Sequence, residues 1–118
     1  MTVETKAQSG DDFSLCPKFE KTFGILGKKW NGLIIDVLLF AGVQRFSDLS
    51  QKIPECSDRV LVERLKELVK EGLVVRQSID GSKHKVVYEL TEQGKDLAPI
   101  FNDVHAWAER WFSLEDCV

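Results

Sequence analysis

The sequence predicts a mainly α-helical domain with a small antiparallel β-hairpin, arranged as a winged helix-turn-helix. Three observations indicate this fold. Residues 47–72 contain two stretches with apolar side chains at helical spacing, separated at Pro54. The second stretch ends at Gly72, a residue type that commonly terminates helices. Two β-rich runs then flank residues 80–82, whose sequence Asp-Gly-Ser favours a turn.

Two further helices are expected before this unit. Pro17 suits the first position of a helix, and apolar residues at helical spacing continue from there to Gly27. A second apolar stretch begins at Trp30 and stops at Gly42. Residues 45–46 are then expected to form a very short strand.

The central unit has clear start and stop signals. Ser47 is expected to cap the helix that ends before Pro54, and Ser57 to cap the next helix. The strands of the hairpin are expected at residues 73–79 and 85–90. The helix that begins at Ser57 should turn four apolar side chains inward, namely Val60, Leu61, Leu65 and Leu68.

The last helix is expected to be capped by Thr91, with Pro99 marking either a kink or a late start. Its apolar stripe follows the helical period for four turns and is rich in aromatic side chains. A single small winged helix has little core with which to cover such a stripe, so an interface is expected there. The alternative is that the stripe packs against the helix of Phe19 and Phe23 in the same chain.

Length and composition indicate one ordinary globular domain. The chain has 118 residues, of which 43% are hydrophobic and 30% charged. We expect a flexible N-terminal arm at residues 1–12, the winged helix at 13–113 and a flexible tail at 114–118. No apolar run approaches the roughly 18 residues that span a bilayer, and the first residues lack the apolar centre of a signal peptide. A cytoplasmic location is therefore expected, with no membrane partner.

The distribution of charge along the chain is compatible with nucleic-acid binding, although the net charge is negative. The chain carries −3 overall, but residues 57–85 carry seven Lys or Arg against five Asp or Glu, and so +2. The expected DNA face is thus the basic part of an acidic molecule. An alternative function is a winged-helix protein–protein interaction module without DNA binding, which the acidic net charge favours.

The outer face of the helix from Ser57 is expected to enter the major groove of DNA. Ser57, Arg59 and Val62 lie near its start and are candidates for base contacts, since Arg can bridge guanine O6 and N7. Arg64 and Lys66 suit phosphates or helix pairs with neighbouring glutamates. The other possibility is an ordinary solvated surface helix. The full set of expected DNA-binding residues is Arg45, Ser57, Arg59, Val62, Arg64, Lys66, Lys83, His84 and Lys85.

Fragments spread over residues 16–111 form an ordered combination. They are Cys16-Pro17, Gly27-Lys28-Lys29-Trp30, Arg45-Phe46-Ser47-Asp48-Leu49, Val60-Leu61, Arg64-Leu65-Lys66-Glu67-Leu68, Gly72-Leu73-Val74 and Tyr88-Glu89-Leu90-Thr91-Glu92-Gln93-Gly94. This combination resembles the HxlR family of bacterial transcription regulators, which are winged-helix relatives of the MarR group. Two departures are visible. The family usually has Gly-Gly-Lys-Trp at residues 27–30, and it often has prolines at the wing tip, where this chain has residues 80–84.

The resemblance implies a homodimer, built from the N-terminal and C-terminal helices, that binds a pseudo-palindromic operator in double-stranded DNA. It also implies that the helix from Ser57 is the recognition helix and that residues 83–85 form the wing. We expect a regulator of transcription, and specifically a repressor. The expected dimer contacts are Phe19, Phe23, Ile100, Phe101, Val104, Trp107 and Trp111.

Cys16 carries the sharpest chemical hypothesis. It directly precedes Pro17, so free backbone N–H groups and the helix dipole favour its thiolate, which an oxidant or small electrophile would modify. Some members of the family use a cysteine at this position as a sensor. The alternative is a small residue that simply fits. Cys117 is expected to be near enough to form a disulfide with Cys16 of the other subunit. Cys56 is expected to be an unreactive turn residue; the alternative is that its modification, beside Ser57, disturbs DNA contact.

Enzymatic, metal and cofactor chemistry are not expected. The three cysteines share no metal-ligand spacing with one another or with His84 and His105. A small thiol enzyme centred on Cys16 would want a base or a resolving cysteine nearby, as in C-x-x-C, and the sequence offers none.

Overall fold

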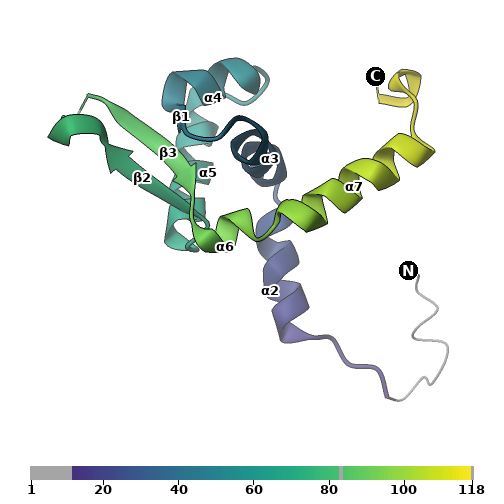
Figure 1. The fold of residues 1–118 in the computed structure, drawn as a ribbon. Helices are drawn as coiled ribbons and strands as arrows, with labels where there is room; N and C mark the ends of the chain where they lie inside the picture. The colour runs from purple at the N-terminus through teal and green to yellow at the C-terminus, as the bar shows by residue number, and fades with distance from the viewer. Residues whose placement is uncertain (1–11, 83, 118) are drawn as a thin grey trace.

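The computed structural model describes residues 12–82 and 84–117, and its elements follow the order expected for a winged helix (Figure 1). Two helices come first, a helix-turn-helix follows, and a β-hairpin leads into the C-terminal helices. The elements are α2 Pro17–Leu26, α3 Asn31–Ala41, β1 Gln44–Arg45, α4 Phe46–Lys52, α5 Asp58–Lys70, β2 Val74–Ser78, the 3-10 turn η1 Ile79–Gly81, β3 Val86–Leu90, α6 Glu92–Lys95, α7 Ala98–Trp111 and the 3-10 turn η2 Leu114–Cys117.

The core lies between α3, α4, α5 and the base of the hairpin. Leu61, Leu65 and Leu68 of α5 are buried as predicted, because the helical period places them on one face. Val60 is half-buried at the edge of this core, so it contributes less than expected. Other buried apolar side chains are Ile34, Ile35, Leu38, Leu49, Ile53, Cys56, Leu73, Val74 and Leu90.

The wing belongs to a three-stranded antiparallel sheet in the order β1-β3-β2. β3 pairs with β2 along its whole length, from Leu90 opposite Val74 to Val86 opposite Ser78. It also pairs with the two-residue strand β1, where Gln44 lies opposite Tyr88. Each strand differs from its predicted bounds by about a residue. The sheet joins the start of the helix-turn-helix to the wing.

Both predicted signals at the ends of α5 are confirmed. The Ser57 hydroxyl accepts a hydrogen bond from the Val60 N–H at 3.2 Å. At the other end Gly72 has φ +85°, and the Leu73 N–H donates to the Leu68 carbonyl at 3.0 Å. This left-handed turn costs little only at glycine, which explains why the helix stops there.

The predicted cap of α4 is wrong by two residues. The helix already includes Phe46 and Ser47, so Ser47 is not its cap. Arg45 occupies the cap position, and its backbone N–H donates to the Asp48 carboxylate at 2.9 Å. The carboxylate three residues into the helix therefore closes the first turn from within.

Thr91 caps a different helix from the one expected. Its hydroxyl accepts from the Gly94 N–H at 3.1 Å and begins the four-residue α6. The long helix α7 starts separately at Ala98, with Pro99 in its first turn. Of the two alternatives for Pro99, the late start is therefore confirmed.

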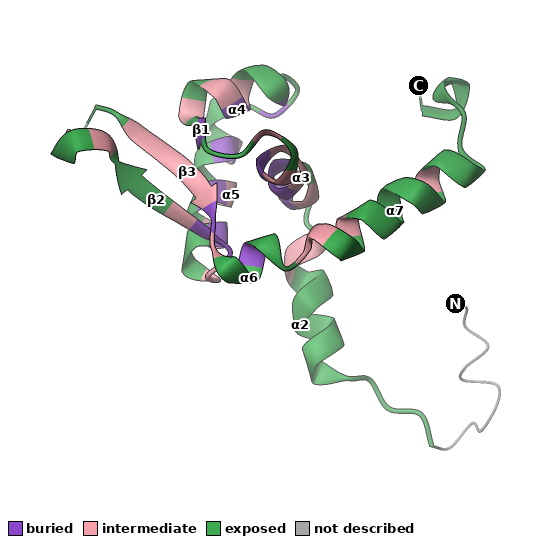
Figure 2. Cartoon of the chain, in the orientation of Figure 1, coloured by how far each residue is buried: buried purple, intermediate pink, exposed green. Residues whose placement is uncertain are grey.

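Helices α2 and α7, both wholly among the described residues, contain no buried residue and extend from the body of the domain (Figures 1 and 2). Residues 114–117 of the expected tail form η2. The expected arm lies outside the described residues except for Asp12. No helix in the described ranges is both long and apolar enough to cross a membrane.

Candidate nucleic-acid interface

The outer face of α5 is exposed along its first two turns. Burial of the leucines on the opposite face fixes the rotation of the helix, so Arg59, Val62 and Lys66 point away from the core. The cap residue Ser57 is also exposed. Val62 keeps 38% of its surface accessible, which leaves an apolar contact between two cations. This is the mixture of side chains with which a helix reads base edges in a major groove.

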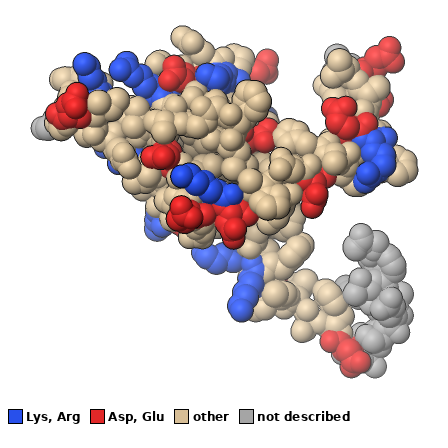
Figure 3. Space-filling model, viewed as in Figure 1, with Lys and Arg blue, Asp and Glu red and all other residues tan. Residues whose placement is uncertain are grey.

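Three of the expected DNA-binding cations are free of ion pairs. In residues 12–82 and 84–117, no carboxylate oxygen lies within 4.0 Å of the charged nitrogens of Arg45, Arg59 or Lys66. In Figure 3, Lys and Arg side chains lie along the edge formed by the wing and α4. Exposed cations without an internal partner favour an anionic one.

Arg64 is placed differently from these cations. Its side chain is 29% exposed, and its Nη1 lies 3.7 Å from Oε1 of Glu67, one turn further along α5. The sequence left open whether Arg64 contacts phosphate or pairs within the helix. Its position in the structure favours the helix pair.

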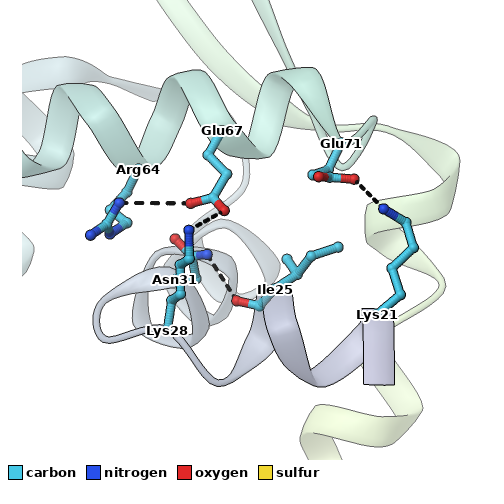
Figure 4. Close-up of polar contacts among 7 residues, drawn as sticks. All are labelled: Lys21, Ile25, Lys28, Asn31, Arg64, Glu67 and Glu71. Atoms are coloured by element: carbon cyan, nitrogen blue, oxygen red, sulfur yellow. Dashed lines mark hydrogen bonds and ion pairs between the residues drawn. The ribbon is translucent and has the colours of Figure 1, made fainter. Parts of the chain in front are cut away.

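Two ion pairs connect the N-terminal helix region to α5 and its C-cap residue (Figure 4). The Lys28 ammonium donates to Glu67 Oε2 at 2.7 Å, and the Lys21 ammonium donates to Oε1 of Glu71 at 3.0 Å. Lys28 is the residue at which the chain departs from the Gly-Gly-Lys-Trp pattern. The departure therefore adds a cation that holds the turn after α2 against α5.

The Glu67 carboxylate is stabilised in its charged form. The hydrogen bond from Lys28, assisted by the charge of Arg64, lowers the pKa of Glu67 below its ordinary value, although partial burial opposes this. Because its pKa is lower in the folded state, the Glu67 carboxylate stabilises the folded protein fully at pH values above the ordinary glutamate pKa. That stabilisation is lost as the pH falls through the lower, folded-state value.

Substitution of Glu67 by glutamine is expected to lower the free energy of unfolding by about 1 kcal/mol at pH 7. The difference from the unsubstituted protein should shrink as the pH falls toward and below the folded-state pKa, because the Glu67 carboxyl is then protonated in both the folded and the unfolded state and is as uncharged as glutamine. Urea titrations at several pH values measure this. Glu63→Gln, on the exposed face of the same helix, is the control. The role of the Lys28 contact would be contradicted if both variants lost the same free energy of unfolding, or if the loss in Glu67→Gln did not change with pH.

The wing presents two of its three expected contact residues. His84 and Lys85 are exposed, and the His84 N–H donates to the Ser82 hydroxyl at 3.1 Å. Asp80 adopts a left-handed conformation, φ +55°, that turns the chain at the tip. Lys83 lies outside the described residues. The hairpin tip thus presents polar and basic groups to solvent.

The cysteines have three different environments. Cys16 is exposed at the N-cap position of α2, where its side chain caps no backbone N–H. Cys117 is exposed as well, with its Sγ 3.4 Å from the Ser113 carbonyl. Cys56 is buried, and this burial raises the pKa of its thiol. The exposure of Cys16 leaves its sulfur open to reagents, whereas Cys56 fits the unreactive turn residue of the sequence analysis.

Most of the expected dimer contacts are exposed apolar side chains. Phe101 is the exception, because it is half-buried against the core. The exposed members are Phe19, Phe23, Ile100, Val104, Trp107 and Trp111. A groove of about 560 Å³ runs between α2, α3 and α7, with Phe23, Trp30 and Val104 among its walls. His105 and Asp36 also line this groove. The His105 Nε2 lies 2.8 Å from Asp36 Oδ1, and this hydrogen bond raises the pKa of His105.

In the part of the chain that the structure describes, no group of three or more His, Cys, Asp or Glu side chains could hold a metal ion. The site missed by the sequence analysis is the ion-pair pattern of Figure 4. Lys28 and Glu67 are 39 residues apart, so no local pattern could have paired them.

Comparisons with known proteins agree with this geometry. The pattern of the family described as HxlR-like helix-turn-helix matches residues 25–116. The HTH-type transcriptional regulator YodB of Bacillus subtilis is 44% identical over 105 residues, which cover 89% of this chain and 93% of YodB. The HTH-type transcriptional regulator YvaP of the same organism is 47% identical over 97 residues, covering 82% of this chain and 89% of YvaP.

Solved structures show the same fold. Reduced YodB from B. subtilis superposes with a TM-score of 0.72 at 44% identity, over 83% of this chain and 95% of YodB. Quinone-bound YodB superposes with a TM-score of 0.71 at 44% identity, over 81% of this chain and 100% of YodB. The redox regulator HypR in its reduced form superposes with a TM-score of 0.74 at 30% identity, over 86% of this chain and 99% of HypR. The chain therefore belongs to the HxlR-like helix-turn-helix family of transcriptional regulators, a family of DNA-binding proteins and not of enzymes.

Proposed function

We propose that the protein is a dimeric, sequence-specific DNA-binding repressor that places α5 of each subunit in successive major grooves of a pseudo-palindromic operator. The observation that carries this proposal is the exposed outer face of α5, where neither Arg59 nor Lys66 forms an ion pair with any residue in 12–82 or 84–117. The buried leucines leave that face no other role in the fold. The wing residues His84 and Lys85 then approach the adjacent backbone or minor groove.

The proposed dimer uses α2 and α7. Trp111 and Trp107 keep 64% and 51% of their surface accessible in the single chain, and Phe19 on α2 keeps 62%. Large aromatic side chains gain most from burial, so their exposure on both α2 and α7 favours association. Isologous pairing of these helices relates the two α5 helices by a two-fold axis, which a pseudo-palindromic site matches.

We also propose that Cys16 senses oxidants or small electrophiles such as quinones. Its sulfur is exposed at the first turn of α2, and α2 belongs to the proposed dimer interface. A quinone bound to the relative YodB supports an electrophile as the signal, and the redox regulator HypR supports an oxidant. Modification at the start of α2 would shift that helix and thereby the separation of the two recognition helices. Cys117, also exposed, is the proposed disulfide partner in the other subunit.

The alternative function is a protein–protein interaction module that keeps the fold without binding DNA. The net charge of −3 favours it. A gel shift with the DNA upstream of the protein's own gene separates the two functions. A DNA-binding protein that contacts several phosphates should lose affinity steeply as salt rises from about 50 to 200 mM. Failure to shift any duplex at low salt would favour the interaction module.

Replacement of Arg59 by alanine is expected to weaken operator binding by about 1–3 kcal/mol and to relax base preference at one position. Selection of bound sequences from a random pool measures the preference. Arg59→Lys keeps the charge but loses the planar fork that bridges guanine O6 and N7, so it should relax the preference while retaining affinity for random DNA. An unchanged preference in both variants would remove Arg59 from base recognition.

A further inference from the structure

A cation occupies the core-facing side of the wing sheet. Along β2, Val74 is buried beneath the core, and Arg76 stands two residues further along the same face. Across the ladder Val74 lies opposite Leu90, which is also buried, and Arg76 lies opposite Tyr88. Beyond Val74 the strand leaves the core, and Arg76 is exposed. Its charge therefore remains accessible on the face of the wing that turns toward α5.

Arg76 shares a groove with a cation of the recognition helix. The groove has a volume of about 510 Å³ and lies between α5 and the two wing strands. Lys66 lies one turn beyond Val62 on α5, and both Lys66 and Arg76 are exposed. The residues that line the groove are Val62, Leu65, Lys66, Val69, Arg76 and Tyr88.

No carboxylate neutralises this pair of cations. Among residues 12–82 and 84–117, no carboxylate oxygen comes within 4.0 Å of the charged nitrogens of either Lys66 or Arg76. Glu89 is next to Tyr88 in sequence, but strand alternation places it on the opposite face of the sheet. Two unpaired cations that converge on one apolar groove repel each other unless an anion joins them. Arg and Lys together are the side chains that bind a phosphate group.

We propose that Lys66 and Arg76 jointly bind one backbone phosphate of duplex DNA in the groove between the recognition helix and the wing. The proposal rests on the proposed function, because the DNA strand is brought there by insertion of α5. Arg59, Val62 and Lys66 follow one another at helical spacing on the outer face, so Lys66 reaches the rim of a major groove that Arg59 has entered. There the sugar–phosphate backbone passes between helix and wing.

The site fixes the register of α5 without reading sequence. A phosphate contact carries no base information, but it sets how deeply and at what angle the helix lies. Because Arg76 comes from β2 and Lys66 from α5, the phosphate also joins the wing to the helix. Arg76 thereby becomes a positioning residue for the base contacts expected of Arg59.

Salt titrations with Arg76→Gln test the proposal, with an operator duplex and a random duplex of equal length. The variant should bind both duplexes more weakly by the same factor, on the order of tenfold. The slope of log affinity against log salt should fall by about 1. Arg76→Lys should retain the slope, because the charge remains. The double variant Lys66→Gln/Arg76→Gln should lose little more slope than Arg76→Gln alone, since the two cations share one phosphate.

Arg110→Gln removes the same charge from the last turn of α7, a helix that extends away from α5 and the wing strands in Figure 1, and should leave the slope unchanged. Circular dichroism melts verify that each variant is folded. If the unsubstituted protein binds DNA with a steep salt dependence and Arg76→Gln retains both affinity and slope, the phosphate site is wrong and the proposed function stands. A loss of about two slope units in the double variant overturns the shared site. If the unsubstituted protein binds neither duplex, both proposals fall.

Discussion

Replacement of Trp107 by aspartate is expected to convert the protein into a monomer and to weaken operator binding by at least about a hundredfold. The indole lies in the middle of the exposed apolar stripe of α7 and keeps 51% of its surface accessible in the single chain. At the centre of an interface, aspartate would remove a large apolar contact and bury a charge without a partner. A monomer also gives up the second half-site, whose binding is intramolecular in a dimer. Sedimentation velocity measures the association state, and gel shifts measure the affinity.

The matched control is Asn102→Asp, which adds the same charge to α7. Asn102 lies on the side of the helix opposite the stripe of Ile100, Val104 and Trp111, as helical spacing requires. This variant should remain dimeric and bind DNA as before. If Trp107→Asp also stays dimeric, the stripe is not the dimer interface. If it becomes monomeric yet binds the operator at full strength, dimerisation is not what provides operator affinity.

The sequence predicts best the parts of the fold whose signals are local. The leucines of α5 are spaced so that only one face of a helix can hold them, and Leu61, Leu65 and Leu68 are indeed buried. The positions of Ser57 and Gly72 at the ends of this helix follow from one hydroxyl and one left-handed turn. The hairpin likewise depends on residues that are neighbours along the chain.

Errors arose where two local signals competed. Both Ser47 and Asp48 can start a helix, and the carboxylate of Asp48 determines the outcome because it reaches the backbone N–H of Arg45. Thr91 has the correct chemistry for a cap, but the chain turns again before Pro99, so the cap serves a four-residue helix. A sequence pattern alone shows neither which of several nearby residues will cap a helix nor which helix a given cap will serve.

Other features depend on contacts between distant segments, and the sequence could not indicate them. Arg76 has the same strand parity as Val74, but its importance emerges only when α5 forms the opposite wall of the groove. The sequence likewise presents Lys28 as a departure from a family pattern. Its structural role follows from the fold, which places the Lys28 ammonium 2.7 Å from the Glu67 carboxylate, to which it donates a hydrogen bond.

Replacement of Cys16 by serine is expected to leave operator binding intact in the absence of reagents and to abolish its release by quinones and by diamide. In the unsubstituted protein we expect either reagent to weaken binding by at least about tenfold, which corresponds to roughly 1.4 kcal/mol. The reason is the exposed position of the sulfur at the first turn of α2. A serine hydroxyl fits the same place but is not nucleophilic enough to react. Fluorescence anisotropy of labelled operator measures the release.

Cys117→Ser distinguishes two chemical routes. A quinone adds to a single thiolate, forming one C–S bond while the ring is reduced to a hydroquinone, so the response to quinone should persist in this variant. Diamide removes two electrons and two protons from two thiols to form a disulfide. If Cys16 pairs with Cys117 of the other subunit, the diamide response should vanish in Cys117→Ser, and the disulfide-linked dimer should disappear from non-reducing gels. A Cys16→Ser protein that still releases DNA with diamide would place the sensing thiol elsewhere. Cys117 and Cys56 would then be the candidate thiols. Cys117 is exposed, whereas the burial of Cys56 requires the domain to open before that thiol can react.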